Sequence, residues 1–195
     1  MIEYKLLDQE LKSNNGTFQW EIGKTYTIDK PGNKMCSDEV FHCYNHPVLA
    51  VLFNPTHGFI DNPRLFEIEV PEFVNNDGLK YASKSQKLIK EIDLPVISME
   101  QRAEFAIRVA KMVCKDEAWN SWADKWLSGE DRSRESANAA ADAVSFFDSV
   151  AYYAARAAAS NSAYAAAWAA DDSARISVTN DDFIRIIEEI LDRQS

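Results

Sequence analysis

The sequence has no proline after residue 95 and almost no glycine after residue 78. All six prolines lie in residues 1–95, and Gly129 is the one glycine of six that lies beyond Gly78. Alanine has the opposite distribution: residues 1–95 contain only two, whereas eighteen of the thirty-eight residues from 137 to 174 are alanine. Because proline and glycine interrupt helices and alanine favours them, this change predicts two domains, residues 1–95 and residues 96–195.

The chain also has few cysteines, few basic residues and no long apolar run. Three cysteines do not make a disulfide framework, and no run reaches the ~18 apolar residues of a membrane-spanning helix. Lys and Arg number 21 against 31 Asp and Glu, a formal net charge of −10, which disfavours direct binding to nucleic acid. The start, MIEYKLLDQE, does not resemble a secretory signal. We therefore expect an acidic cytoplasmic protein that does not enter a membrane.

Residues 1–95 have the patterns of a mixed, mainly antiparallel β domain. The segment Arg64–Val70 alternates, with Phe66, Ile68 and Val70 on one face and two glutamates on the other, which predicts a half-buried strand. The segment Tyr81–Ile92 predicts strand or mixed structure. PVLAVLF, residues 47–53, begins with proline and predicts a short helix.

Residues 96–195 have the patterns of an alanine-rich helical bundle, so the predicted fold class is α+β. Ser98 and Gln101 form a capping-box pattern that starts a helix at about Met99. The alanine tract predicts two helices with a break at residues 160–162, and Thr179 precedes a last helix. The charged residues of the tract exclude a membrane helix, and the absence of a recurring period excludes a solenoid.

No complete catalytic motif is present, but residues 36–57 concentrate cysteine and histidine. Zinc could take four ligands from this segment, in order Cys36, Cys43, His46 and His57, but the spacing is not that of a known finger. On a strand, His42 and Cys43 point to opposite faces, which disfavours a shared ion and a Cys–His nucleophile. We expect no metal and no catalytic residue here. Phe41 and Cys43 would pack inward while His42 faces a groove or solvent.

A second conspicuous stretch is WADKWLSGEDRS, residues 122–133, followed by Arg134. Asp131, Arg132 and Arg134 could make a polar site beside Trp126. The other interpretation is a capped turn between helices, in which Asp131 opens the next helix. The first interpretation makes Trp126 and Arg132 candidate ligand-binding residues.

The order of motifs in the first half resembles an uncharacterised domain common in bacteriophage and prophage proteins. The shared residues run from Trp20-Glu-Ile-Gly23-Lys24-Thr-Tyr26 through Cys36, Phe41-His42-Cys43 and Pro47 to Arg64–Val70. The pattern of that family is "GK-Y … C-x-x-GFHA … P-x-x-V … EV", and the likeness covers about residues 1–95. Val40 stands where the family has glycine. The resemblance, which extends to alanine-rich tails of phage-associated chains, implies a phage protein that acts in the host cytoplasm.

A shorter likeness covers about thirty residues. Val40–Phe53, followed by the strand Leu65–Val70, resembles the middle of an ADP-ribosyltransferase fold, where a "GIYFA" strand leads through a short helix to an "EVALG" strand. His42 takes the place of the tyrosine of that motif. The upstream histidine and the catalytic glutamate of that fold have no counterpart that we can locate. The resemblance implies a nucleotide-shaped groove without evidence for turnover.

Together these patterns favour a phage-encoded, non-catalytic binding protein that targets a host or defence-system component. It would dock on a basic protein or sequester a small nucleotide signal, and we expect no cofactor. The candidate ligand-binding residues are His42, Tyr44, Arg64, Trp126 and Arg132. One alternative is a divergent ADP-ribosyltransferase-like or other nucleotide-processing enzyme, with Glu67 or Glu69 as acid/base partner of His42. The other is a structural protein whose helical bundle forms a homo-oligomer.

Overall fold

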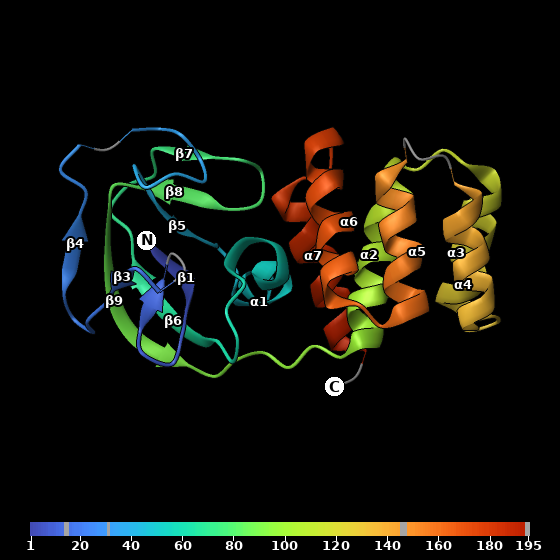
Figure 1. Ribbon diagram of the computed structural model, residues 1–195, viewed down its shortest axis with the longest axis horizontal. Coiled ribbons are helices and arrows are strands. Elements are labelled where there is room, and N and C mark those ends of the chain that lie inside the picture. Colours follow the sequence, from blue (N-terminus) through green and yellow to red (C-terminus); the bar gives the residue numbers. More distant parts are fainter. Residues whose placement is uncertain (14–15, 31, 145–147, 194–195) are drawn as a thin grey trace. The chain divides into compact units, whose positions relative to one another are not determined.

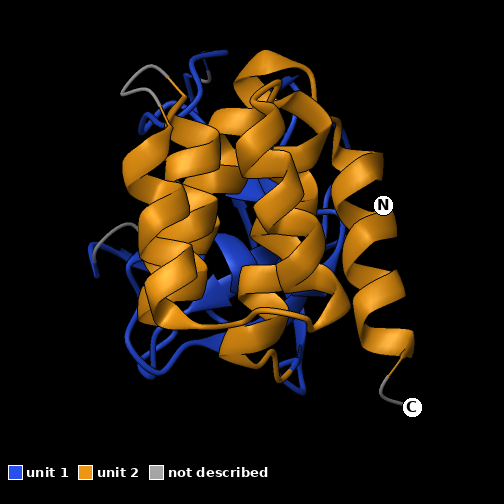
Figure 2. Cartoon of the chain, turned by 90° about the vertical axis from the view of Figure 1, so that its right-hand side faces the viewer, with its two compact units in different colours: residues 1–95 blue, residues 96–195 orange. Residues whose placement is uncertain are grey.

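The computed structural model describes residues 1–13, 16–30, 32–144 and 148–193 (Figure 1). The chain divides into two compact units, Met1–Pro95 and Val96–Ser195, which are coloured separately in Figure 2. Within the described residues, the first unit contains three antiparallel sheets and one α-helix, and the second contains six α-helices. The predicted α+β class is therefore confirmed.

The main sheet of the first unit has four antiparallel strands in the order β1–β6–β9–β4. Their bounds are Ile2–Leu7 for β1, Thr25–Thr27 for β4, Arg64–Glu69 for β6 and Ser85–Ile92 for β9. The predicted strand at residues 64–70 is thus confirmed. In the register of β1 and β6, Glu3 lies opposite Ile68 and Lys5 lies opposite Phe66. Two charged side chains therefore share a sheet face with apolar residues.

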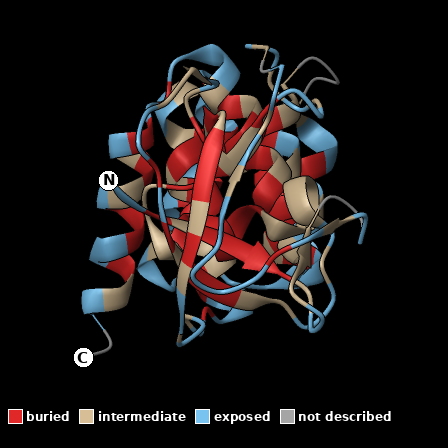
Figure 3. Ribbon diagram, turned by 90° about the vertical axis from the view of Figure 1, so that its left-hand side faces the viewer, coloured by how far each residue is buried: buried red, intermediate tan, exposed pale blue. Residues whose placement is uncertain are grey.

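Smaller elements complete this unit. Strands β5 (Phe41–Cys43), β8 (Tyr81–Ser83) and β7 (Asn75–Asn76) form one sheet, and β2 (Lys12–Ser13) pairs with β3 (Phe18–Gln19). The segment 81–92 thus divides between two sheets. Helix α1 (Pro47–Phe53) confirms the predicted short helix and continues as a π-helix, η1 (Asn54–Gly58). One buried core cluster of this unit consists of Leu7, Trp20, Cys43, Phe66, Ile68, Val70 and Leu88. Figure 3 colours the buried residues red.

The second unit consists of α2 (Met99–Val113), α3 (Glu117–Ser128), α4 (Arg134–Ala143), α5 (Ser149–Ser160), α6 (Ala163–Ile176) and α7 (Asn180–Asp192). The capping box at Ser98 and the cap at Thr179 are confirmed. The break at residues 160–162 is also confirmed, because Asn161 ends α5 in the left-handed conformation with φ 49°. Among the described residues, no helix combines the length and apolar composition needed to cross a membrane.

Two helix boundaries differ from the prediction. The alanine tract contains three helices, because α4 ends at Ala143 and Asp148 caps α5 by accepting a hydrogen bond from the backbone N–H of Ala151 at 3.2 Å. The sequence interpretation has Asp131 as the residue that caps α4, but the helix begins two residues later. Ser133 is its cap, and Asp131 instead accepts from the N–H of Ser133 at 2.9 Å. The turn interpretation of residues 122–134 therefore holds.

Alanine lets the helices of this unit approach closely. Helix α5 packs against α2, α4 and α6, and its Ala151, Ala154 and Ala155 have no exposed surface. The indole Nε1 of Trp119 reaches across to donate to the carbonyl of Ala151 at 3.1 Å. Large aromatic side chains thus fill the spaces between alanine-lined backbones.

Candidate functional site

The candidate site is a groove of about 510 Å³ that lies entirely in the first unit. Its walls come from β1, β5, the segment 36–38 and the α1–η1 region. A volume of this size lies in the range of about 300–1,000 Å³ in which small-molecule sites fall. Its polar lining includes Lys5, His42, Tyr44, His57 and Lys80, and its aromatic lining includes Phe18, Phe41 and Phe59.

His42 is presented by β5. Its neighbours Cys43 and Phe41 lie in or against the core cluster, but all three residues line the groove, so the predicted separation of His42 from its neighbours is only partial. Its Nε2 accepts a hydrogen bond from the backbone N–H of Cys36 at 3.0 Å. A nitrogen that accepts is unprotonated, so in the neutral ring the proton is on Nδ1. Within the described residues Nδ1 has no hydrogen-bond partner, and His42 lines the groove, so this N–H is a candidate donor to a ligand.

The surroundings keep His42 neutral. Burial lowers its pKa to about 4, and the charges of Lys5 and Lys80 act in the same direction. Asp77 opposes them with a smaller effect. The histidine is therefore uncharged near neutral pH, and the electrostatic potential at its ring is positive.

The two lysines are held in different ways. The Nζ of Lys5 donates to the carbonyl of His42 and lies 5.0 Å from the centre of the Trp20 ring. Burial lowers the pKa of Lys5 to about 8. Lys80, with a side chain only 7% exposed, has its Nζ 3.4 Å from a carboxylate oxygen of Asp77. Both cations are thus largely withdrawn from water beside the groove.

Tyr44 and His57 form a pair on the same groove. The Tyr44 hydroxyl lies 2.7 Å from Nδ1 of His57. The His57 ring stacks on Phe53, with ring centres 5.3 Å apart and planes 14° apart. Tyr44 follows β5 directly and His57 belongs to η1, so the contact joins two walls of the groove. Tyr44, a candidate from the sequence, thus lies in the same groove as His42.

The other three candidates do not line the groove. Arg64 binds Glu91 through Nε and Nη2, at 2.9 and 2.5 Å, and its guanidinium lies 5.3 Å from the ring centre of Phe66. Trp126 and Arg132 belong to the other unit. There the Arg132 guanidinium covers the Trp126 ring at 4.7 Å and donates to the Trp126 carbonyl at 2.9 Å. These contacts hold the end of α3 within the second unit.

Sequence reasoning missed Lys5, Lys80 and Phe59. Lys5 offers a signal in retrospect, because it alternates with Leu7 on the face of β1 that meets Phe66. A lysine on the face that carries the core residues Leu7 and Phe66 is expected to be buried, even though β1 is an edge strand of the main sheet. Lys80 and Phe59 carry no comparable local pattern. Their places depend on how distant segments meet.

The carboxylates that the enzyme alternative requires lie elsewhere. In the register of the main sheet, Glu67 lies opposite Tyr4 and therefore faces away from Lys5. It pairs with Lys90 at 3.3 Å, and Glu69 is exposed. Neither residue lines the groove. Among the described residues, no three His, Cys, Asp or Glu side chains are grouped as metal ligands would be.

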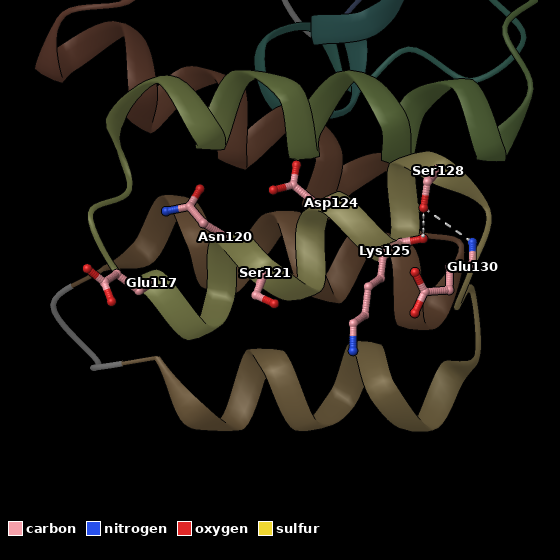
Figure 4. Close-up of a pocket in the computed structure, with 7 residues that line it drawn as sticks. All are labelled: Glu117, Asn120, Ser121, Asp124, Lys125, Ser128 and Glu130. Carbon is pink, nitrogen blue, oxygen red and sulfur yellow. Dashed lines mark hydrogen bonds between the residues drawn. The ribbon is translucent and has the colours of Figure 1, made fainter.

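A second surface depression follows α3 in the other unit (Figure 4). Its lining residues all come from α3 and the turn after it, and Figure 4 shows them spread along one side of the helix. The Ser128 hydroxyl is engaged locally, donating to the Lys125 carbonyl at 3.0 Å. Because its described lining residues come from a single helix and the turn after it, this depression is an ordinary helix surface.

Comparison with known proteins identifies the first unit. A family model described as a domain of unknown function, DUF7666, matches residues 1–100. The groove lies wholly within this range. No curated protein and no solved structure matches the chain. The phage origin and the ADP-ribosyltransferase likeness stay predictions from the sequence.

Proposed function

The chain belongs to the DUF7666 family, and we propose that it is a non-catalytic protein that binds a small phosphate-bearing ligand in the groove of its first unit. The observation that carries the proposal is the convergence of Lys5, His42 and Lys80 on one groove from three separate segments. Two ammonium groups and an N–H donor suit a phosphate, which accepts several charge-assisted hydrogen bonds. Their burial strengthens each such interaction because solvent screening is weak there.

The chemistry of His42 supports binding without catalysis. A general base needs a free lone pair within reach of the proton it removes. In His42, Nε2 already accepts from Cys36, and Nδ1 carries the proton. With a pKa of about 4, the ring is also a poor general acid near neutral pH because it is not charged. As a neutral donor, it can still hold an anion.

The biological setting of this proposal comes from the sequence. The N-terminal motif order that resembles prophage proteins supports a phage-encoded protein that withholds a signal molecule from a host defence system in the host cytoplasm. Sequestration of a nucleotide is one case of phosphate binding. The net charge of −10 supports the other predicted form, docking on a basic protein, without pointing to a surface for it.

The test compares Lys80→Gln with Lys84→Gln by isothermal titration calorimetry with ribose 5-phosphate. Lys84 follows β8 and its side chain is 41% exposed, which makes it a matched control outside the groove. Loss of a charge-assisted bond of about 1.5–3 kcal/mol should weaken binding roughly 10- to 150-fold in Lys80→Gln and little in Lys84→Gln.

Folding of Lys80→Gln does not depend on the ammonium group. The Asp77 carboxylate also accepts from the backbone N–H groups of Leu79 and Lys80, at 3.1 and 2.9 Å, so the turn is retained. Circular dichroism should show the same spectrum for both variants. Absence of binding to the unmodified protein at millimolar ribose 5-phosphate, or equal losses in the two variants, would refute the proposal.

A further inference from the structure

Phe59 combines two features that ordinary folding does not favour. Its side chain is 66% exposed, so the ring gains little from burial. Its backbone has φ 51° and ψ 35°, in the left-handed region where glycine is the usual residue. A bulky residue there is an outlier, and such positions persist only where the surroundings enforce them.

The surroundings of Phe59 enforce this backbone. Both polar atoms of the Asn54 side chain bind Ile60: Oδ1 accepts from its N–H at 3.1 Å and Nδ2 donates to its carbonyl at 2.9 Å. The N–H of Phe59 donates to the Asn54 carbonyl at 2.8 Å. A Cβ at Gly58 would lie 2.5 Å from the Asn54 Oδ1, so glycine is required beside this clamp. The π-helix η1 thus ends in a clamp that holds an exposed aromatic ring.

The ring lines the same groove as the cationic groups. Phe59, Lys5, His42 and Lys80 all border the cavity of about 510 Å³. Lys5 and Lys80 are nearly buried, at 7% and 5% exposure, while Phe59 is open to solvent. The groove therefore offers an anion-binding region that is withdrawn from water and an aromatic face that is not. A ligand that uses both regions has an anionic group and a planar ring.

We infer that the ligand is a nucleotide whose base stacks on Phe59 while its phosphate binds Lys5, His42 and Lys80. This inference rests on the proposed function and adds the ligand class to it. A base presents a flat π-face to an aromatic side chain, and stacking of this kind tolerates different bases. Phe59 therefore distinguishes nucleotides from sugar phosphates without selecting one base.

The experiment compares adenosine 5′-monophosphate with ribose 5-phosphate by isothermal titration calorimetry. Stacking should make the nucleotide bind about 5- to 150-fold more tightly to the unmodified protein. In Phe59→Ala the nucleotide should lose this advantage, and the affinity for ribose 5-phosphate should not change. Phe59→Trp should keep the preference. Phe59→Leu, which keeps an apolar side chain but removes the ring, should behave like the alanine variant.

Phe59→Gly provides a variant whose folding is not in question. Glycine adopts the left-handed backbone without strain, so the clamp by Asn54 should remain and the thermal midpoint should rise. This variant should still lose the preference for the nucleotide. An unchanged preference in both the glycine and the alanine variants would overturn the role of Phe59.

The two proposals fail in different ways. If ribose 5-phosphate does not bind to the unmodified protein at millimolar concentration, the phosphate-binding function fails and the nucleotide inference, which rests on it, fails with it. If both probes bind equally and Lys80→Gln weakens both, the phosphate-binding function is supported and the nucleotide inference is overturned.

Discussion

Glu3 should make the stability of the first unit depend on pH, and replacing Glu3 by glutamine should remove this dependence. Its side chain lies on β1, is only 6% exposed, and has one carboxylate oxygen without a hydrogen-bond partner. Burial raises the pKa of Glu3 from 4.5 to about 7, and the positive N-terminus opposes this shift only in part. We predict that Glu3→Gln stabilises the protein at pH 8 and not at pH 4.

The sign and size follow from proton linkage. A carboxyl group with a raised pKa keeps its proton in the folded state at pH values where the unfolded chain has released it. Its contribution to stability is therefore fully present below pH 4.5 and is lost as pH rises through 7. A shift from 4.5 to about 7 corresponds to about 3 kcal/mol, at ~1.4 kcal/mol for each pH unit. Glutamine does not ionise and avoids this loss.

Urea unfolding of both proteins from pH 4 to pH 8 measures the effect. The difference in unfolding free energy should grow by about 3 kcal/mol in favour of Glu3→Gln across this range, and a carbon-13 titration should place the Glu3 pKa near 7. Glu69→Gln is the control, because Glu69 is exposed at the end of β6. A stability difference that stays constant with pH, whatever its value, would refute the reasoning.

Two further predictions concern the second unit. Ala154→Leu should destabilise it by about 1–3 kcal/mol in thermal unfolding, because Ala154 has no exposed surface and a larger side chain overpacks the helix contacts. The control is Ala143→Leu, which should be tolerated because Ala143 is exposed. Equal effects of the two substitutions would contradict a closely packed alanine core. Arg132→Ala should cost about 1–2 kcal/mol in urea unfolding through loss of its stacking and hydrogen bond on Trp126. Arg132→Ala should leave the binding of ribose 5-phosphate unchanged. Weaker binding would show that Arg132 contributes to ligand binding after all.

Local patterns account for most of the elements. The alternation around Phe66, the proline that starts α1, and the caps at Ser98 and Thr179 act within a few residues, so the sequence alone predicts them. The end of α4 at Ala143 was missed because alanine favours helix on both sides of it and the cap at Asp148 was not weighed. The start at Ser133 rather than Asp131 was missed because both residue types cap helices.

The sequence by itself determined that a strand around residues 41–43 would point His42 to the face opposite Phe41 and Cys43, and β5 has those bounds. Only the tertiary structure decided what His42 meets. Lys5 reaches it from a strand 37 residues away in sequence. Phe59 takes a left-handed backbone because the Asn54 clamp holds Ile60. That clamp is local, but the groove that Phe59 and Lys5 share is built from segments far apart in the sequence. The burial of Lys5 and the meeting of these residues arise from contacts between distant segments, and a local pattern does not encode them.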